Sequence, residues 1–164
     1  MIFLTVGTQF PFDRLVQAID KALAEGRLNE EVFGQVGRLG QGNYRPRHFP
    51  TVEHLDKEQF EEQMNRAVRI IGHAGMGTIT AALERRKPLL VMPRRKRYGE
   101  IVNDHQVPIA REFARAGYLL AAQDVTDLPD KLTQLPGFVP RRRAANIEQV
   151  LGRIREFLQE CRRG

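Results

Sequence analysis

The chain has 164 residues, 41% hydrophobic and 28% charged, a composition that excludes general disorder and predicts one globular domain. No apolar run approaches the roughly 20 residues that span a bilayer, and the apolar start MIFLTV is too short for a signal peptide and lacks a basic leader, so we expect a cytoplasmic protein. The formal net charge of +6 suits an anionic partner, but aromatic residues are few and no recognition motif occurs, which argues against nucleic acid.

The first part of the chain predicts two strands, two helices and a loop. Residues 2–6 are apolar and end at Gly7 and Thr8, and residues 12–26 carry apolar side chains at helical spacing. A strand followed by a Gly-Thr turn and a helix usually seeds a parallel sheet. Residues 31–36 predict a second strand and the basic, glycine-containing residues 37–48 a surface loop. Residues 56–66 predict a helix capped near Asp56, with Phe60 and Met64 on its buried face.

The centre of the chain, residues 68–79, combines an apolar run with three glycines, a His and a Thr. The run VRII predicts a strand, and the later segment ITAALERR has the apolar spacing of a helix. Glycines in the turn between them let the backbone approach a ligand closely, and the first N–H groups of the helix attract an anion. The stretch therefore predicts a phosphate or diphosphate site.

The next elements complete a parallel sheet. Residues 88–93, PLLVMP, are apolar without alternation, as a strand covered on both faces requires. After the basic loop RRKRYGEIVND, we expect Asp104 to cap a helix that ends at Gly117. Residues 118–121 predict a short last strand and residues 127–135 a short helix. The fold class we expect is α/β, a single Rossmann-like domain with helices on both faces of the sheet.

The C-terminal segment is predicted to be a separate helix. A joint at Pro136, Gly137 and Pro140 divides the chain into a domain of residues 1–137 and a segment of residues 138–164. Within residues 141–163, apolar residues at three- and four-residue steps form a broad stripe that includes Cys161, the only cysteine of the chain. The stripe either packs back on the domain or docks on a partner, and both interpretations stay open.

Three segments occur in a recognisable order: Gly7-Thr8 after the first strand, the run from Gly72 to Thr78 after a central strand, and Asn103 to Gln106 before a helix. Together they resemble the nucleotide-sugar-binding half of GT-B glycosyltransferases, specifically the stand-alone C-terminal-domain proteins of family 28. Within that family the chain is similar to the small donor-binding subunit of the dolichol-pathway UDP-GlcNAc transferase. It is more similar to bacterial exopolysaccharide glycosyltransferase subunits that work as a split pair. The resemblance covers about residues 1–117.

The resemblance implies a role for each segment. The donor diphosphate would be held by His73, Ala74, Gly75, Met76, Gly77 and Thr78. Hydroxyl groups of the donor sugar would be bound by Asn103, Asp104, His105 and Gln106, and Gly7 and Thr8 would face the cleft. Oriented N–H groups can stabilise a leaving diphosphate, so the sequence requires neither a metal nor another cofactor, and the UDP-sugar is the substrate.

Two positions depart from the family pattern. Many nucleotide-sugar transferases bind the ribose through an acidic residue eight positions after the His, whereas this chain has Ala81 there, so the ribose contact is not assigned. The dolichol-pathway subunit reads Asp-Asn-His-Gln, whereas here Asn103 precedes Asp104, as in the exopolysaccharide subunits. The transferred sugar is therefore glucuronic acid, GlcNAc or another sugar, and the exopolysaccharide likeness favours a glucuronosyl donor.

The resemblance also implies a partner. A complete GT-B enzyme has a second half that binds the acceptor, and 164 residues leave no room for it. We expect a membrane-anchored partner polypeptide that binds a lipid-linked saccharide acceptor, recruits this chain to the inner face of the membrane and can carry the catalytic base. No catalytic residue is assigned here. One alternative is a non-catalytic nucleotide-sugar-binding or regulatory module that stabilises a partner transferase, and another is a sheet protein that binds some other phosphorylated ligand.

The basic loop before Asn103 has three interpretations. Arg94, Arg95 and Arg97 could contact the donor's phosphates or a uronic acid carboxylate, which arginine pairs in a bidentate manner. The loop could instead face an anionic membrane leaflet, or it could simply be solvated. Its place directly before the sugar-contact segment favours the first interpretation.

Overall fold

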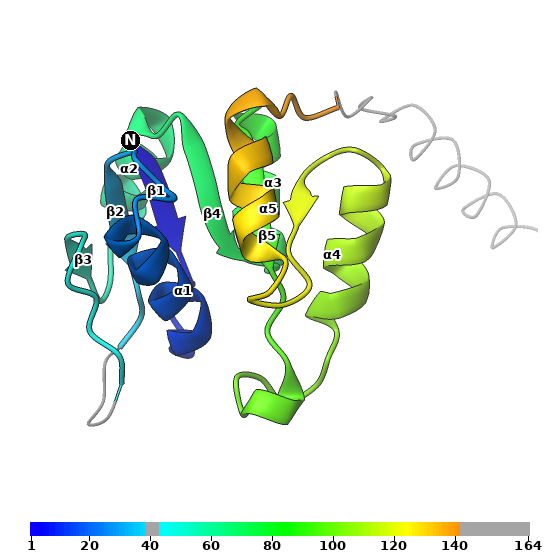
Figure 1. Cartoon of the computed structure of the whole chain (residues 1–164). Coiled ribbons are helices and arrows are strands. Elements are labelled where there is room, and N and C mark those ends of the chain that lie inside the picture. The colour runs from blue at the N-terminus through cyan, green and yellow to red at the C-terminus, as the bar shows by residue number, and fades with distance from the viewer. Residues whose placement is uncertain (39–42, 142–164) are drawn as a thin grey trace, which may run out of the picture.

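The computed structural model describes residues 1–38 and 43–141, which form a parallel six-stranded sheet with helices on both faces (Figure 1). The strands lie in the order β3-β2-β1-β4-β5-β6, and every neighbouring pair is parallel. The bounds are β1 Ile2–Thr5, β2 Val32–Gln35, β3 Thr51–Val52, β4 Arg69–His73, β5 Leu89–Met92 and β6 Leu120–Ala121. The predicted Rossmann-like α/β class is therefore confirmed.

Helices cover the two faces of the sheet unequally. The bounds are α1 Asp13–Ala24, α2 Lys57–Arg66, α3 Met76–Glu84, α4 Gln106–Arg115 and α5 Leu128–Gln134, with short 3-10 helices η1 Lys96–Tyr98 and η2 Leu135–Gly137. One buried cluster joins the sheet to α1 and α5, and a second joins it to α2, α3 and α4 (Figure 1). The chain passes from β1 to α1 on one face of the sheet and from β4 to α3 on the other face. Because β1 and β4 are neighbours, these two connections diverge at the middle of the sheet.

Strand β5 shows why the apolar run PLLVMP forms a central strand. Leu90 and Met92 enter the cluster under α1 and α5, whereas Leu89 and Val91 enter the cluster under the other three helices. Side chains alternate between the faces of a strand, so a strand covered on both faces is apolar at every position. Each such side chain contributes about 1.5–3 kcal/mol when fully buried. The predicted strand is confirmed.

The start of α2 also follows the sequence prediction. Asp56 is the N-cap, and its carboxylate accepts a hydrogen bond from the backbone N–H of Gln59 at 2.8 Å. The Gln59 side chain accepts one from the Asp56 backbone N–H at 3.1 Å, which completes a capping box. Because the cap fixes where the helix begins, it also sets which α2 side chains face the neighbouring helix α3.

Three local features differ from the expectations. The two-residue edge strand β3 was not predicted, because it is too short to show alternation. The basic loop contains the 3-10 helix η1. The predicted cap of α4 by Asp104 is wrong: the N-cap is His105, no side chain caps the helix, and Asp104 instead accepts a hydrogen bond from the Lys96 N–H at 2.7 Å.

Some of the sequence predictions concern residues that lie outside the described part of the chain. Residues 39–42 of the predicted surface loop and residues 142–164, with most of the predicted C-terminal helix and Cys161, belong to that part. The domain boundary at residue 137 and the two interpretations of the apolar stripe therefore stay predictions. The described chain ends with Arg141, whose backbone N–H donates a hydrogen bond to the Gly117 carbonyl at 2.8 Å.

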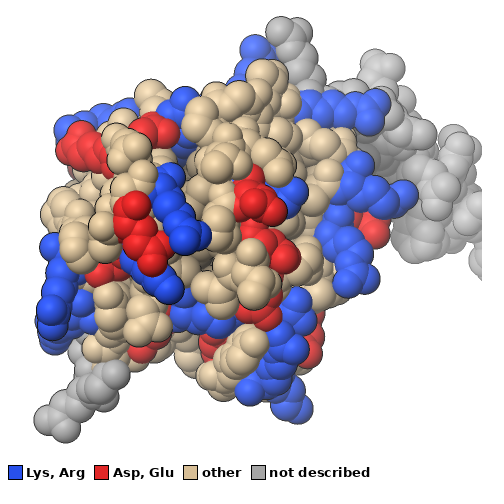
Figure 2. Space-filling model, in the orientation of Figure 1, with Lys and Arg blue, Asp and Glu red and all other residues tan. Residues whose placement is uncertain are grey.

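Basic side chains do not form one continuous patch on the face shown in Figure 2. Lys and Arg lie there in separate groups, mostly near the edges, with acidic side chains between them. Among the helices that the structure describes, none combines the length and the apolar character of a membrane span.

Candidate functional site

A cleft of about 750 Å³ opens at the carboxyl edge of the sheet, where β1 and β4 lie side by side. Six parts of the chain line it: the end of β1 with the following loop, the end of β2, the start of α2 with the residues just before it, the end of β4 with the start of α3, Arg94 after β5, and the end of the loop that leads to α4. In open α/β sheets, ligands bind where the connections of adjacent strands diverge to opposite faces. The position of the cleft is therefore that of a ligand site.

The amino end of α3 is open toward this cleft. Its N-cap, Gly75, makes no side-chain cap, and the first intrahelical hydrogen bond runs from the Ile79 N–H to the Gly75 carbonyl at 3.0 Å. The preceding N–H groups thus have no acceptor within the helix. Gly77 is exposed, and a Cβ added to it would meet nothing within 4 Å. The free N–H groups and the positive end of the helix dipole give this end of the cleft the chemistry that suits an anion.

His73 lies on the floor of the cleft against two glycines. A Cβ on Gly7 would lie 3.1 Å from the His73 Cε1 atom, and a Cβ on Gly75 would overlap the His73 Nε2 atom. Gly7 also has a φ of +76°, a conformation that favours glycine. The sequence predicted that the glycines of the turn let a ligand approach the backbone closely. The structure instead shows Gly7 and Gly75 making room for the imidazole, while Gly77 leaves space for a ligand.

His73 is neutral at physiological pH. Burial, and next the positive charge of Arg94, lower the pKa of His73 to about 4 from its usual value of 6.5, although the backbone of Thr5 opposes this shift. Its Nδ1 atom is buried and has no hydrogen-bond partner among the residues described. A neutral imidazole can donate or accept a hydrogen bond at a ligand but binds protons too weakly to be an efficient general base near pH 7.

Arg94 is a buried residue rather than part of a solvated loop. Its side chain is 3% exposed and donates hydrogen bonds to the carbonyl of Val6, at 2.7 Å, and to the carbonyl of Phe10. The guanidinium also lies 5.3 Å from the centre of the Phe12 ring. Burial lowers the pKa of Arg94 to about 10, so it stays charged at physiological pH. Arg94 lines the cleft and ties the loop after β1 to the loop after β5.

The other two arginines of the loop do not line the cleft. Arg95 donates to the Gln123 carbonyl at 2.8 Å, and Arg97 pairs with Asp124 at 2.6 Å. Asp124 belongs to the loop after β6 and does not line the cleft. Of the three arginines predicted to contact an anion, the structure therefore places only Arg94 at the cleft.

The structure places three of the four predicted sugar-contact residues at the cleft. Asn103, His105 and Gln106 line the cleft, whereas Asp104 does not and holds η1 instead. The Asn103 side-chain oxygen accepts a hydrogen bond from the His105 backbone N–H at 3.2 Å, which fixes the turn before α4. Gln106 is 4% exposed, and its amide oxygen accepts from the Arg94 N–H at 3.1 Å. Its amide nitrogen remains available to a ligand.

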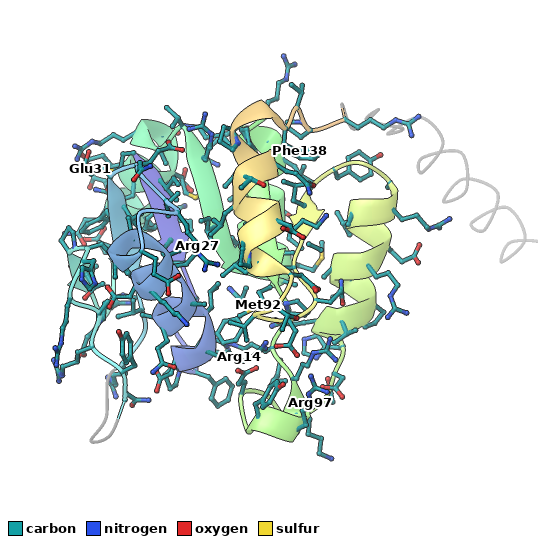
Figure 3. All side chains as sticks on the ribbon, viewed as in Figure 1. Arg14, Arg27, Glu31, Met92, Arg97 and Phe138 are labelled. Atoms are coloured by element: carbon teal, nitrogen blue, oxygen red, sulfur yellow. The ribbon has the colours of Figure 1, made fainter. Side chains whose placement is uncertain are left out.

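The loop that carries Asn103 is anchored by an arginine of α1. Arg14 pairs with both carboxylate oxygens of Glu100, at 2.7 and 2.9 Å, and with Asp124 at 3.0 Å. Figure 3 shows Arg14 beside Met92, with Arg97 on the short helix η1. Arg14 is separated from Glu100 by 86 positions in the sequence, so no local pattern indicates this pair.

The cleft also contains residues that the sequence did not indicate. The buried side chains of Thr5 and Gln35, at the ends of β1 and β2, are hydrogen-bonded to each other at 3.1 Å on its floor. The first turns of α2 contribute a wall formed by Leu55, Asp56, Lys57, Phe60 and Glu61. In the sequence these residues show only the pattern of an amphipathic helix. The predicted cleft residues Gly7 and Thr8, by contrast, do lie at the cleft.

A second cavity, of about 870 Å³, lies between α1 and residues 43–48. Its buried carboxylate, Asp20, accepts hydrogen bonds from the Tyr44 hydroxyl at 2.6 Å and from the backbone N–H groups of Arg47 and His48. Burial raises the pKa of Asp20, but these hydrogen bonds outweigh it and lower the pKa below its usual value. Hydrogen-bond donors of the protein itself thus engage this carboxylate, and the carboxylate holds the loop onto α1. Within the described part of the chain, no His, Cys, Asp and Glu side chains group as metal ligands would.

The strand order and the cleft at its switch point define a Rossmann-like domain with a candidate ligand site at the carboxyl edge of its sheet. The model of the glycosyltransferase family 28 C-terminal domain matches residues 1–154, so the chain belongs to this family. The fold is that of one half of a GT-B glycosyltransferase, as the resemblance implied.

Curated relatives and solved structures agree with this family. The human UDP-N-acetylglucosamine transferase subunit ALG13 is 29% identical over 124 residues, which are 72% of this chain and 10% of the relative. The subunit of the same name in Yarrowia lipolytica is 27% identical over 135 residues, 76% of this chain and 65% of the relative. The chain thus spans about a tenth of the first relative and about two thirds of the second.

The similar structures establish the fold. The solution structure of ALG13 superposes with a TM-score of 0.58 at 20% identity and covers 88% of this chain and 90% of its own. MurG of Acinetobacter baumannii superposes with a TM-score of 0.58 at 21% identity, covering 82% of this chain but only 40% of MurG. The chain therefore corresponds to one of the two halves of a longer glycosyltransferase such as MurG.

Proposed function

We propose that this chain is the nucleotide-sugar-binding subunit of a two-component glycosyltransferase that uses a UDP-sugar. The observation that carries the proposal is the open amino end of α3 in the cleft, with free N–H groups and an unobstructed Gly77. Two curated relatives are named as subunits of a UDP-N-acetylglucosamine transferase, which supports both the donor class and the need for a partner chain.

In the proposed reaction, an acceptor hydroxyl attacks the anomeric carbon of the donor sugar. The bond between that carbon and the β-phosphate oxygen breaks, and UDP leaves with an additional negative charge. We propose that the N–H groups of Met76, Gly77 and Thr78 stabilise this charge as it develops, together with the helix dipole. This part of the chemistry needs no metal ion, and we propose that none takes part.

The acceptor hydroxyl must also lose a proton. His73, on the floor of the cleft, is a poor base because its pKa is about 4. We therefore place the catalytic base on the partner chain, together with the acceptor site. The partner is proposed to be membrane-anchored, to bind a lipid-linked saccharide in exopolysaccharide or glycan assembly, and to recruit this chain to the inner face of the membrane.

The donor sugar is a separate question within this proposal. Arg95 and Arg97 are engaged by Gln123 and Asp124, so their support for a uronic acid carboxylate is weaker than the sequence indicated. Asn103 and Gln106 offer neutral amide groups that suit sugar hydroxyls, and His105 lines the cleft beside them. UDP-GlcNAc and UDP-glucuronic acid are the two donors to compare.

The test is a transfer assay with the two-chain complex. The chain is co-expressed with a candidate membrane-anchored partner, chosen from the genes that neighbour its own, and radiolabelled donor sugar is followed into the lipid fraction. Gly77→Trp should abolish transfer, whereas Gly137→Trp, a glycine whose added Cβ also meets nothing within 4 Å, should not. Full activity of the Gly77→Trp complex would contradict the proposed site.

The same assay separates catalysis from a regulatory role. If the partner alone transfers sugar and Gly77→Trp changes only the stability of the complex, the chain is a non-catalytic module that stabilises its partner. If transfer needs both chains and an unobstructed cleft in this one, the subunit contributes the donor site.

A further inference from the structure

The wall of the cleft formed by α2 contains carboxylates, whereas α3 contributes none. Among the described residues that line the cleft, the acidic side chains are Asp56 and Glu61, both at the start of α2. On the facing side, α3 presents Ala81, whose side chain has no polar atom. A polar ligand group that reaches this corner must therefore be bound by α2.

Glu61 is held in place at this corner by Arg85. The Arg85 Nη2 atom pairs with the Glu61 Oε2 atom, and Nη1 of the same guanidinium donates to the Ala81 carbonyl at 3.0 Å. Its Nε atom donates to the Asn65 side chain at 2.9 Å. Because one rigid guanidinium bonds three groups, the carboxylate is fixed beside Ala81 rather than free to swing into solvent.

The carboxylate keeps an acceptor for a ligand. Arg85 engages only Oε2, and the Glu61 side chain lines the cleft and is 43% exposed, so Oε1 is left for a ligand. The Asp56 carboxylate also keeps one oxygen, but it caps α2, and among the described residues no hydrogen bond ties it to α3 as Arg85 ties Glu61. Glu61 is thus the acceptor that the corner offers.

The spacing along α3 identifies what reaches Glu61. Ala81 lies four residues beyond Gly77, which is about 6 Å along a helix that rises ~1.5 Å per residue. A diphosphate bound at the start of α3 would therefore place the next group of the donor at this corner. Leu55 and Phe60 line the same wall and offer apolar surface to a ring. On the other side of the α3 terminus lie Asn103 and Gln106, at the proposed sugar end.

We infer that Glu61 binds the ribose hydroxyl groups of the donor nucleotide, so that the nucleoside lies along α2 and the sugar toward α4. A carboxylate is the group that accepts hydrogen bonds from ribose hydroxyls in other nucleotide-binding sheets, and its charge strengthens each bond. Glu61 can bind a ribose only if the chain binds a nucleotide-sugar, so the assignment rests on the proposed function.

The test compares UDP with 2′,3′-dideoxy-UDP, which lacks both ribose hydroxyls, by isothermal titration of the full chain. The unmodified protein should bind UDP about tenfold more tightly or better, because a hydrogen bond to a charged group has about this effect. Glu61→Ala should bind the two nucleotides with nearly equal affinity, and Glu61→Gln, which keeps the shape and an uncharged acceptor, should retain part of the preference.

Glu62→Ala is the matched control, because Glu62 is the next residue of α2, is 62% exposed and does not line the cleft. It should keep the full preference for UDP. If Glu61→Ala still prefers UDP as the unmodified protein does, or if the unmodified protein shows no preference, the assignment of Glu61 is wrong while nucleotide binding stands. If the unmodified protein binds neither nucleotide, the proposed function fails with it.

Discussion

Replacing Gly77 by alanine should stabilise the fold and weaken ligand binding. Gly77 is the second residue of α3, its φ is not positive, and an added Cβ meets no atom within 4 Å. Replacing a glycine by alanine at such a position restricts the unfolded chain and typically adds about 0.4–1 kcal/mol of stability. For a chain of this size, we expect a rise in Tm of about 1–4 °C.

The effect on binding has the opposite sign. The methyl group would occupy the space through which a phosphate reaches the free N–H groups of α3. Loss of one hydrogen bond to a charged group costs about 1.5–3 kcal/mol, which weakens binding about tenfold or more. A variant that is more stable and binds less cannot be explained by partial unfolding.

Thermal melting and isothermal titration with UDP measure the two effects on the same sample. Gly137→Ala serves as the control, because its added Cβ is equally unobstructed but lies far from the cleft lining. Gly75→Ala should behave differently and destabilise the fold, since its Cβ would overlap His73. If Gly77→Ala binds UDP as tightly as the unmodified chain, the amino end of α3 does not hold the diphosphate.

Three further predictions concern the floor and the loop of the cleft. The pKa of His73 is about 4 in the folded chain and 6.5 in the unfolded chain, so the unfolded chain takes up the proton first as the pH falls. The stability that the neutral His73 contributes is therefore complete above pH 6.5, and roughly 3 kcal/mol of it is lost between pH 6.5 and 4. Urea unfolding should show that His73→Asn lacks this loss, and an equal pH dependence of the two proteins would refute it. Arg14→Met should lower the free energy of unfolding by about 3 kcal/mol, because it leaves the largely buried Glu100 without its ion-pair partner and removes one of the two arginine partners of Asp124. Arg115→Ala, at an exposed pair, should change the free energy of unfolding by less than about 0.5 kcal/mol, and equal losses in the two variants would show that the network adds nothing. Gln106→Ala should weaken binding of UDP-GlcNAc more than binding of UDP, whereas Asp104→Ala, at a residue outside the cleft lining, should have a smaller effect on UDP-GlcNAc binding. Titration of both variants with both ligands measures this, and a larger effect of Asp104→Ala would restore Asp104 as the sugar contact.

The local features of the site could be predicted from the sequence because short segments encode them. The run from Gly72 to Thr78 carries its own strand end, turn and helix start, and the structure places them as expected. The strand at residues 88–93 is recognisable because burial on both faces leaves an uninterrupted apolar run. Neither prediction needs knowledge of residues far away in the chain.

The role of Arg94 could not be predicted in this way. In the sequence it begins a run of four basic residues that suggests a solvated or anion-binding loop. Its acceptors are carbonyl groups of Val6 and Phe10, 88 and 84 positions earlier, which only the parallel pairing of the strands brings near. A basic run therefore does not reveal which of its members is buried.

The wall of α2 was missed for a related reason. Glu61 belongs to a helix whose apolar pattern indicates only which face is buried. The link between Glu61 and Ala81 is made by Arg85, which bonds the carboxylate of the first and the backbone carbonyl of the second. The proposed ribose contact therefore comes from a helix other than the one in which the sequence pattern places an acidic residue.

Titration of the ¹⁵N-labelled chain with UDP-GlcNAc, followed by amide NMR, tests the central claim most directly. The amide signals of Met76, Gly77 and Thr78 should shift with a common saturation curve, together with those of Asn103 and Gln106 on the other side of the cleft. UDP alone should shift the first group and leave the second largely unchanged. No saturable shift, or shifts confined to the cavity between α1 and residues 43–48, would contradict nucleotide-sugar binding in the cleft.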